Sequence, residues 1–514
     1  MELEKVLGRI DGRGYKAYKD LKGLRWKVRN FEFTFKKIQG DPFAPPSVVE
    51  VRLPIRGEGL PVEDLLHRVL WKVLRRHSRK RGEGKGGLLA LPKPSNAMLR
   101  RSSVKASGEV RARIWVGLPS RRRRVLADEA LEMLTKDLPR ALEEGLKEFE
   151  NRREEHERTY NIYMEIRKKL EKLKLISFVA DGSVLPRACS SCEEPLEGAV
   201  PFESPSSLRI EVETSYGTIA GMGLKVGIVS ITGPAFHGKT TLLEAIARGI
   251  WPHVPGDGRE RVVTREDAFY VRSEDGRRVS CVDISTFLNL KNSECFNTED
   301  ASGATSAAST LQESVEGGSR LLLLDEDYTA TNFLYFDDRL KGLYDVKTVY
   351  TISEKLKSMK EKGLSMIVVA SGSAPILAQS DAVIYMKNYL PHDITSKANK
   401  ISVEVEAIPY EFPRERELSY KAPEKVKVRG PWLESKEWRS PIRTEANIHL
   451  VEEGQLEFLA RLLQRPFRGR ARSAKVPDPW DLCTSPGCSE VRTLDYLFVL
   501  NRSEGLRARL LGSG

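Results

Sequence analysis

The sequence predicts an α/β protein whose core is a mixed β-sheet with helices on both faces. Residues 206–396 alternate short apolar runs with segments of helical periodicity, which is the pattern of strands joined by helices. One apolar run, LKVGIVSITG, enters a glycine turn before the helical KTTLLEAIARGI, and two more, RLLLLDED and SMIVVASGS, end in polar residues. We expect this core at residues 181–400, an α/β N-terminal domain at 1–180 and a smaller α+β C-terminal domain at 401–514.

Five segments outside this pattern predict further elements. Residues 24–39 and 103–119 alternate apolar and polar side chains, as half-buried strands do. Residues 62–81 and 451–464 carry apolar side chains at helical spacing. Residues 126–175 have a helical, highly charged pattern with many acid–base neighbours four residues apart, which predicts a long solvated helix or a helical hairpin.

The composition is that of a folded protein without a membrane segment. Of the 514 residues, 40% are apolar and 30% are charged. The 84 basic and 72 acidic residues leave a net charge of +12, which either favours an anionic partner or serves solubility. No apolar run approaches the roughly 18–20 residues that span a bilayer, and the charged start, MELEKVLGRIDGRGYK, does not resemble a signal peptide. We therefore expect a cytoplasmic protein with no membrane partner.

A phosphate-binding loop is predicted between the first core strand and its helix. GPAFHGKT matches the pattern G-x4-G-K-[ST] in the strand–loop–helix context that the pattern requires. In such loops backbone N–H groups and the helix N-terminus face the phosphates. Lys239 would reach the β- and γ-phosphates of ATP, and the Thr240 hydroxyl would ligate Mg²⁺. The alternative is a glycine turn that merely precedes Lys-Thr. The residues assigned to nucleotide binding here are Gly233, Pro234, Ala235, Phe236, His237, Gly238, Lys239, Thr240 and Thr241.

The run LLLLDED predicts the metal and base positions of the same site. A buried strand would deliver Asp325 to Mg²⁺, and the next residue, Glu326, could act as general base on the attacking water. Alone, this run would be read as a strand followed by an acidic turn. Its pairing with the phosphate loop favours the functional interpretation.

A stretch of small residues, ASGATSAAS, precedes the acidic strand. Ser302, Gly303 and Ala304 would let backbone and a hydroxyl approach a phosphate closely, and a Ser-Gly segment that opens a helix before an Asp-Glu pair is the order found in ABC-type ATPases. The simpler interpretation is a small-residue helix start packed against a neighbouring element.

At this point the chain resembles the predicted ATPases of the ABC class, a family with ABC-type P-loop cores, its own N- and C-terminal regions and no membrane partner. The resemblance runs through nearly the whole chain. It includes the strings DGRGYKAYKDLKG, QGDPFAPPS, FVADGSVLPR, VPFESPSSL, HVPGDGRERVVT, DGRRVSCVDIS, TEDASGATSAAS and DEDYTATNF.

The resemblance implies an ATPase that binds ATP and Mg²⁺ at composite sites of a homodimer. Ser302 and Gly303 would cap the γ-phosphate held by the partner protomer. Asn332 would occupy the D-loop position, and Asp283 would lie where a Q-loop residue is expected and contact Mg²⁺ or water. Ser371 stands where transporters usually place a histidine, which favours slow, switch-like hydrolysis.

Three other features leave alternatives open. The cysteine pairs at 189 and 192 and at 483 and 488 could be thiols, disulfides or a zinc site, and two more cysteines lie in the core segment. Tyr216 is a candidate for stacking on adenine, although a structural role is the commoner use of such a residue. Basic clusters at 75–86, 121–124 and 465–475, the last with Phe467, suit phosphate backbones of RNA or DNA but also solvated surface.

Three functions follow from these features. The first is a homodimeric ATPase whose closure on ATP grips or releases nucleic acid, so that nucleic acid changes turnover in a salt-dependent way. The second is a nucleotide-regulated scaffold that dimerises with ATP and hardly hydrolyses it. The third is a small-molecule phosphotransferase, which would form ADP only with an acceptor; the Asp-Glu pair and the Ser-Gly segment favour water activation instead.

Overall fold

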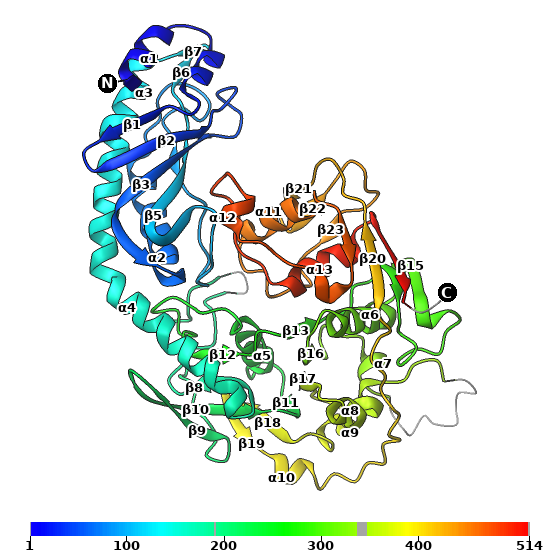
Figure 1. Cartoon of the computed structure of the whole chain (residues 1–514). Helices are drawn as coiled ribbons and strands as arrows, with labels where there is room; N and C mark the ends of the chain where they lie inside the picture. Colours follow the sequence, from blue (N-terminus) through cyan, green and yellow to red (C-terminus); the bar gives the residue numbers. More distant parts are fainter. Residues whose placement is uncertain (1, 190–191, 337–346, 512–514) are drawn as a thin grey trace. The chain divides into compact units, whose positions relative to one another are not determined.

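The computed structural model describes residues 2–189, 192–336 and 347–511 (Figure 1). The chain forms two compact units, each of which includes segments from distant parts of the sequence. The first unit comprises Met1–Arg158, Glu452–Arg461 and Pro477–Glu490, and the second comprises Thr159–Val451, Leu462–Val476 and Val491–Gly514. The boundary falls inside one long helix. The division into three domains stays a prediction.

The first unit is built on a five-stranded antiparallel sheet with strand order β1-β2-β3-β5-β4. Its strands are β1 (Arg25–Val28), β2 (Phe31–Lys37), β3 (Ser47–Glu58), β4 (Leu89–Ala90) and β5 (Val104–Val116), with a small hairpin of β6 (Ser120–Arg121) and β7 (Arg124–Val125). Its helices are α1 (Glu2–Ile10), the 3-10 helix η1 (Tyr15–Leu21), α2 (Leu60–His77), α3 (Ala127–Glu132), the first part of α4 (Leu138–Lys172), α11 (Glu453–Leu462) and α12 (Pro479–Leu482). The buried side chains of the sheet, α1, α2 and the start of α4 form one apolar core.

Most of the elements predicted outside the core are confirmed. The helices at 62–81 and 451–464 are α2 and α11, the strand at 103–119 is β5, and 126–175 is one nearly continuous helical segment of α3, a π-helical turn and α4. The single strand predicted at 24–39 is wrong, because this segment is the β1–β2 hairpin. Arg29 at the turn has a φ of 54°, and the alternation of side chains continues on both sides of it.

The second unit contains the predicted mixed sheet, with strand order β13-β16-β17-β11-β18-β19. Its strands are β11 (Ile228–Thr232), β13 (Ala268–Val271), β16 (Leu321–Asp325), β17 (Ser365–Val369), β18 (Ala382–Lys387) and β19 (Leu390–Asp393). Neighbours are parallel from β13 to β18, and β19 is antiparallel. Every residue of β11, β16 and β17 is buried, as their continuous apolar runs predict.

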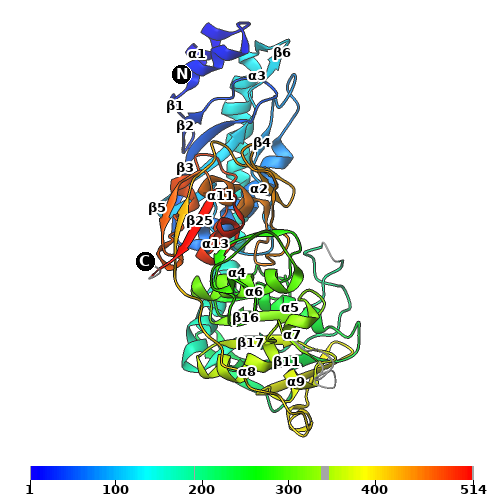
Figure 2. The ribbon, with the colours of Figure 1, turned by 90° about the vertical axis from the view of Figure 1, so that its right-hand side faces the viewer.

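Helices cover both faces of this sheet, so the predicted architecture of the core is confirmed. The helices of the unit are the end of α4, α5 (Lys239–Arg248), α6 (Gly303–Glu316), α7 (Thr331–Leu334), α8 (Ile352–Glu361), α9 (Ala374–Leu377), α10 (Thr395–Ala398) and α13 (Thr493–Arg502). After β11 the chain moves toward β13 at one edge of the sheet, whereas after β16 it moves the other way, to β17. Because such connections are right-handed, α5 and α8 lie on opposite faces of the sheet, as Figure 1 shows. Figure 2 shows the same strands from the side, with α8 and α9 beside them.

Smaller sheets complete the second unit. An antiparallel sheet of order β12-β8-β10-β9 and a β14–β15 hairpin precede the acidic strand, and two three-stranded sheets, β24-β20-β25 and β21-β22-β23, follow the core. These strands are β8 (Leu175–Ala180), β9 (Arg209–Thr214), β10 (Gly217–Lys225), β12 (Val262–Thr264), β14 (Arg277–Val282), β15 (Phe296–Ala301), β20 (Arg416–Tyr420), β21 (Lys427–Arg429), β22 (Trp432–Glu434), β23 (Ile442–Arg443), β24 (Phe467–Gly469) and β25 (Leu506–Leu510).

The cysteines form three disulfides, Cys189–Cys192, Cys281–Cys295 and Cys483–Cys488. Of the alternatives that the sequence left open, the structure therefore has disulfides. Within the described ranges, no group of three or more His, Cys, Asp and Glu side chains is arranged to hold a metal ion by itself. None of the helices in the described part of the chain combines the length and apolar character that crossing a bilayer requires.

Candidate nucleotide-binding site

The predicted phosphate loop connects β11 to α5, and two of its glycines have conformations that other residues rarely adopt. Gly233 has a φ of +134° and Gly238 a φ of +93°. A Cβ atom on Gly233 would lie 2.5 Å from the carbonyl oxygen of Met386, and one on Gly238 would lie 2.8 Å from the ring of Tyr389. Glycine is therefore required at both positions by backbone conformation and by space.

The loop rests on the turn between β18 and β19, a contact that the sequence motif does not indicate. The Asn388 backbone N–H donates to Nδ1 of His237 over 2.8 Å, and the Tyr389 N–H donates to the His237 carbonyl over 3.2 Å. His237 thus holds the loop against this turn. Between the two glycines, Pro234, Ala235 and Phe236 are exposed.

The polar side chains at the start of α5 point into the loop and toward the acidic strand. The Lys239 ammonium donates to the carbonyls of Gly233 and Pro234, each over 2.9 Å. The Thr240 hydroxyl donates to Oδ2 of Asp325 over 3.0 Å, and Thr241 follows in the first helical turn. The α5 N-terminus, which favours anions, thereby lies beside a carboxylate at the end of β16.

Asp325 and Glu326 occupy different environments although they are adjacent. The Asp325 side chain is fully buried and also accepts the Asp327 N–H over 3.0 Å. Burial raises the pKa of Asp325, and no ion pair within the described residues opposes that effect. Glu326 is half-buried, and its carboxylate accepts the Ser371 backbone N–H over 2.7 Å. The structure thus brings together Lys239, Thr240 and the acids of this pair.

The chemistry of these donors fits Mg²⁺. In nucleotide sites Mg²⁺ takes one or two oxygen ligands from the protein and the rest from phosphates and water. A buried carboxylate and a hydroxyl within 3.0 Å of each other, Asp325 and Thr240, match that requirement.

The small-residue segment forms the start of helix α6. Ser302 is the N-cap residue and is exposed, with its hydroxyl 3.0 Å from that of Thr305, and Gly303 is the first helical residue. From Ser306 onward every residue of α6 is buried, and Ala304 is 9% exposed. Helix packing therefore accounts for the small residues inside α6, whereas it does not account for the exposed Ser302. Asn332 lies exposed in α7.

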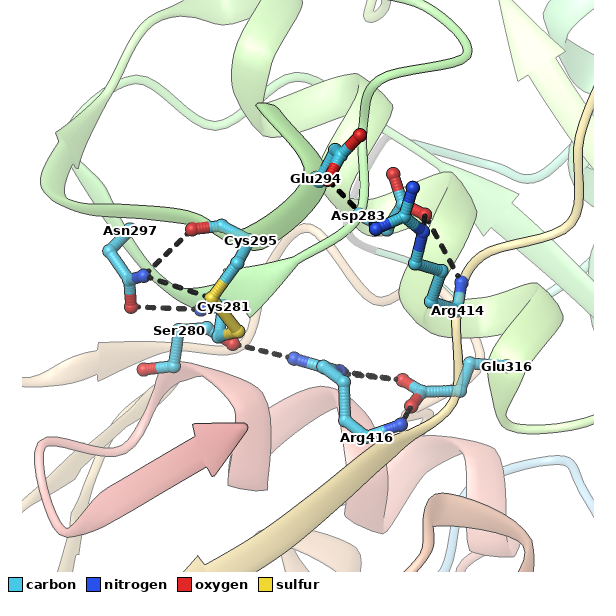
Figure 3. The surroundings of a disulfide bond; sticks show 9 residues. All are labelled: Ser280, Cys281, Asp283, Glu294, Cys295, Asn297, Glu316, Arg414 and Arg416. Atoms are coloured by element: carbon cyan, nitrogen blue, oxygen red, sulfur yellow. Dashed lines mark hydrogen bonds and ion pairs between the residues drawn. A yellow bond between two sulfur atoms is a disulfide. The ribbon is translucent and has the colours of Figure 1, made fainter. Parts of the chain in front are cut away.

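Asp283 lies outside the central sheet, after the last residue of β14. Its carboxylate accepts the Ser285 hydroxyl over 2.6 Å. Figure 3 shows its ion pair with Arg414, over 3.6 Å. The nearby Cys281–Cys295 disulfide ties β14 to the segment that leads into β15. Within the described residues, no hydrogen bond or ion pair joins Asp283 to the phosphate loop, and its catalytic role stays a prediction.

Two further sequence predictions concern residues at turns. Tyr216 lies between β9 and β10, is 41% exposed and accepts a hydrogen bond from Asn161 over 3.1 Å, so its contact with adenine stays a prediction. Ser371 follows β17 and contacts Glu326 through its backbone rather than its hydroxyl.

Sequence reasoning missed Arg272, which follows β13 beside the acidic strand. Its guanidinium carbon lies 4.7 Å from the centre of the Tyr270 ring and 4.1 Å from that of Tyr328. The only available signal was an arginine directly after the apolar run AFYV, and the pairing of that run with the acidic strand is a long-range contact.

Comparisons with known proteins agree with this architecture. The family model ABC_ATPase, described as a P-loop domain, matches residues 150–430, and ABC_N, described as "ATPase of the ABC class N-terminal", matches residues 1–148. An uncharacterized protein of Methanocaldococcus jannaschii is 32% identical over 240 residues, which are 44% of this chain and 53% of that protein. The chain thus spans about half the length of that curated relative.

Among solved structures, the ADP conformation of an ATP-binding cassette of an ABC transporter is similar over 36% of this chain and 88% of its own. The sequence identity is 12% and the TM-score is 0.24, which is too low to support an argument. The family assignment depends on the two family models, of which the P-loop model alone covers more than half of the 514 residues. The chain belongs to the ATPases of the ABC class and carries both the N-terminal and the P-loop domain of that family.

Proposed function

We propose that two copies of the chain bind two ATP molecules with Mg²⁺ at composite sites, hydrolyse them slowly, and couple this cycle to binding of RNA or DNA. The observation that carries the ATPase part is the hydrogen bond between Thr240 and the buried carboxylate of Asp325, beside the Lys239 ammonium. Burial of an acid that has no cation among the described residues is costly, so a glycine turn without a ligand does not account for this arrangement.

Each polar group has a task in this proposal. Lys239, released from its two carbonyl partners, binds the β- and γ-phosphates, and the backbone of residues 233–238 surrounds them. Thr240 and Asp325 would hold Mg²⁺, which would supply positive charge to the phosphates. Glu326 accepts the proton of the attacking water, and the Ser371 N–H keeps its carboxylate oriented toward the end of β17.

Exposed side chains near the loop support the homodimer. Phe236 at the tip of the loop is 94% exposed and has a φ of 65°, which is unfavourable for a bulky residue. Tyr328 and Tyr389 are each more than two-fifths exposed. Aromatic side chains in such positions favour a surface that a second chain covers. Ser302 is exposed as well, so the Ser-Gly segment of a partner could reach the γ-phosphate.

A basic hollow in the first unit supports the nucleic-acid part. The hollow has a volume of about 540 Å³ and is lined by Lys19, Lys22, Lys36, Lys37, Ile38, Arg113 and Thr484. Within the described residues Lys19, Lys22 and Lys37 form no ion pair, whereas Lys36 pairs with Glu50 over 3.1 Å. Uncompensated lysines around a hollow are suited to phosphate groups of a nucleic-acid backbone.

Acids offset part of the charge of the basic clusters noted in the sequence. In the 75–86 cluster, Arg76 pairs with Glu144 in α4 over 2.8 Å, and Arg81 pairs over 2.7 Å with Asp137, the last residue of the π-helical turn before α4. In the 465–475 cluster, Arg470 pairs with Glu415 over 3.0 Å. We assign the main nucleic-acid contact to the hollow rather than to these clusters, because its lysines line one concave surface.

The test is steady-state ATP hydrolysis with single-stranded RNA, duplex RNA or DNA titrated in at low and moderate salt. We expect one polymer to change the rate. In a Lys22→Ala/Lys37→Ala variant, that polymer should bind about 10-fold or more weakly, and the slope of log affinity against log salt should fall by about 2, because two phosphate contacts are lost.

The matched control is Lys27→Ala/Lys72→Ala, which removes the same charge from lysines that are paired with Glu32 and Glu148. Equal losses in the two double variants would show that only net charge matters and would reject the hollow as the site. A hydrolysis rate that ignores every polymer would reject the coupling to nucleic acid while leaving the ATPase intact.

A further inference from the structure

Arg272 lies one strand away from the proposed metal ligand, at the same edge of the sheet. β13 and β16 are parallel, and their register pairs Val271 with Leu324. The next residues in that register are Arg272 and Asp325, and neighbouring strands lie about 4.8 Å apart. Asp325 in turn accepts the hydroxyl of Thr240 from the phosphate loop. The arginine therefore stands at the carboxyl edge of the sheet, where ligands of α/β proteins bind.

Two aromatic rings hold the guanidinium in place. It lies 4.7 Å from the ring centre of Tyr270 in β13 and 4.1 Å from that of Tyr328. Tyr328 belongs to the turn after the acidic strand, since its N–H donates to the Asp325 carbonyl over 3.0 Å. The same turn carries Glu326. The two rings orient the planar cation without neutralising its charge.

The charge of Arg272 has little compensation inside the protein. Within the described part of the chain it forms no ion pair, and the hydrogen bond from its Nη1 to the Glu445 carbonyl is long, 3.4 Å. Arg265, three residues before the start of β13, instead forms a two-pronged pair with Asp267, over 2.6 and 2.9 Å. A preoriented but unpaired guanidinium is the geometry that binds phosphate.

We propose that Arg272 binds the γ-phosphate of ATP and thereby distinguishes ATP from ADP. Arg272 follows β13 and Lys239 follows the loop after β11, and these two strands lie on either side of β16 and β17 in the sheet. The proposal rests on the proposed function, because it requires ATP in the phosphate loop. Two cations on the transferred phosphoryl group would offset the charge that gathers on its oxygens as the bond to the leaving oxygen breaks. After hydrolysis and loss of phosphate, Arg272 would have no ligand, whereas Lys239 would still hold the β-phosphate of ADP.

The experiment measures ATP and ADP affinities of Arg272→Ala with Mg²⁺ in a Glu326→Gln background, so that ATP persists during the titration. We expect ATP affinity to fall about 10- to 100-fold, the usual effect of losing a hydrogen-bonded charge, while ADP affinity changes less than about twofold. Arg272→Lys should recover part of the loss, because it keeps the charge but not the planar donors. An unchanged ratio of ATP to ADP affinity would overturn the proposal.

Two companion variants separate the possible failures. Arg265→Ala, before the start of β13, should leave the ratio of ATP to ADP affinity unchanged. If it changed that ratio as much as Arg272→Ala does, the effect of Arg272→Ala would be explained by a distortion of β13. Lys239→Ala should weaken both nucleotides. If Lys239→Ala binds both normally, the phosphate loop is not the site and the proposed function fails; if it loses both while Arg272→Ala keeps the normal ratio, only the role of Arg272 fails.

Discussion

Two fully buried aspartates, Asp64 in the first unit and Asp325 in the second, have different surroundings. In the first unit, Asp64 accepts bonds from Arg68 over 2.7 Å, from Arg101 over 2.5 Å and from His156 over 3.0 Å. In the second unit, the carboxylate of Asp325 accepts only a hydroxyl and a backbone N–H among the described residues. Burial alone would raise the pKa of both; the arginines lower that of Asp64 far below its usual range, and the pKa of Asp325 stays raised.

The difference separates a carboxylate that holds the fold from one that is suited to a ligand. Arg101 also binds Glu452 over 2.8 Å, and despite burial this arginine lowers the pKa of Glu452 to about 2. In this network each buried carboxylate is paired with an arginine. The network also joins Glu452, which is distant in sequence, to the rest of the first unit. Among the residues that the structure describes, Asp325 has no such cation, so a divalent ion beside it would supply what the protein itself supplies to Asp64.

The largest effect on stability should come from breaking the complete network. Arg101→Ala leaves Asp64 and Glu452 buried without their shared cation and should lower the free energy of unfolding of the first unit by about 3–5 kcal/mol. The neighbouring Arg100, whose side chain is 46% exposed and pairs with Glu490 over 3.6 Å, provides the control. Arg100→Ala should cost less than about 1 kcal/mol in the same urea unfolding experiment. Similar losses in both variants would mean that the network is not a stabilising unit.

Unlike Arg101→Ala, which should destabilise the protein, Asp325→Asn should stabilise it and reduce its ATPase activity. Turnover should fall by at least about 100-fold, because charge stabilisation by the metal is worth several kcal/mol. The folded state binds more protons than the unfolded state between pH 3.8 and the raised pKa of Asp325, so this group makes the metal-free protein less stable as pH rises through that range. The Asn variant lacks the buried charge and should melt at a slightly higher temperature at neutral pH.

Asp327→Asn, at an exposed position two residues on, controls for the change of charge in the acidic turn. It should keep both the turnover and the melting temperature of the wild type. If Asp325→Asn melted lower than this control, the buried carboxylate would be a structural group like Asp64, and the contrast between these two aspartates would disappear.

The parts of the candidate site that could be predicted from the sequence are those encoded locally. The phosphate loop and the Asp-Glu pair stand in short, contiguous motifs, and the glycines of the loop follow from the backbone conformation that phosphate binding requires. The contact of His237 with Asn388 and the pairing of β13 with β16 beside Arg272 join segments that are far apart in the chain, and no local pattern encodes them. For the same reason the sequence did not indicate that Glu452 belongs to the first unit.

For the fold as well, the sequence indicated what local patterns encode and missed what depends on contacts between distant segments. The buried strands and amphipathic helices of the core have clear periods, so their order indicated the mixed sheet. The β1–β2 hairpin was missed because alternation of side chains continues through the turn at Arg29, and no glycine marks that turn. Disulfide pairing could not be chosen over thiols or zinc from spacing alone, since it depends on which chain segments meet.

The most direct test of the central claim, a composite ATP site made by two chains, is the molar mass of Glu326→Gln in solution with ATP and Mg²⁺, measured by sedimentation. The account predicts a dimer with ATP, and a monomer when Ser302→Arg is added, with one ATP still bound per chain. A Glu326→Gln protein that binds ATP and keeps the mass of a single chain, 57.9 kDa, would contradict it.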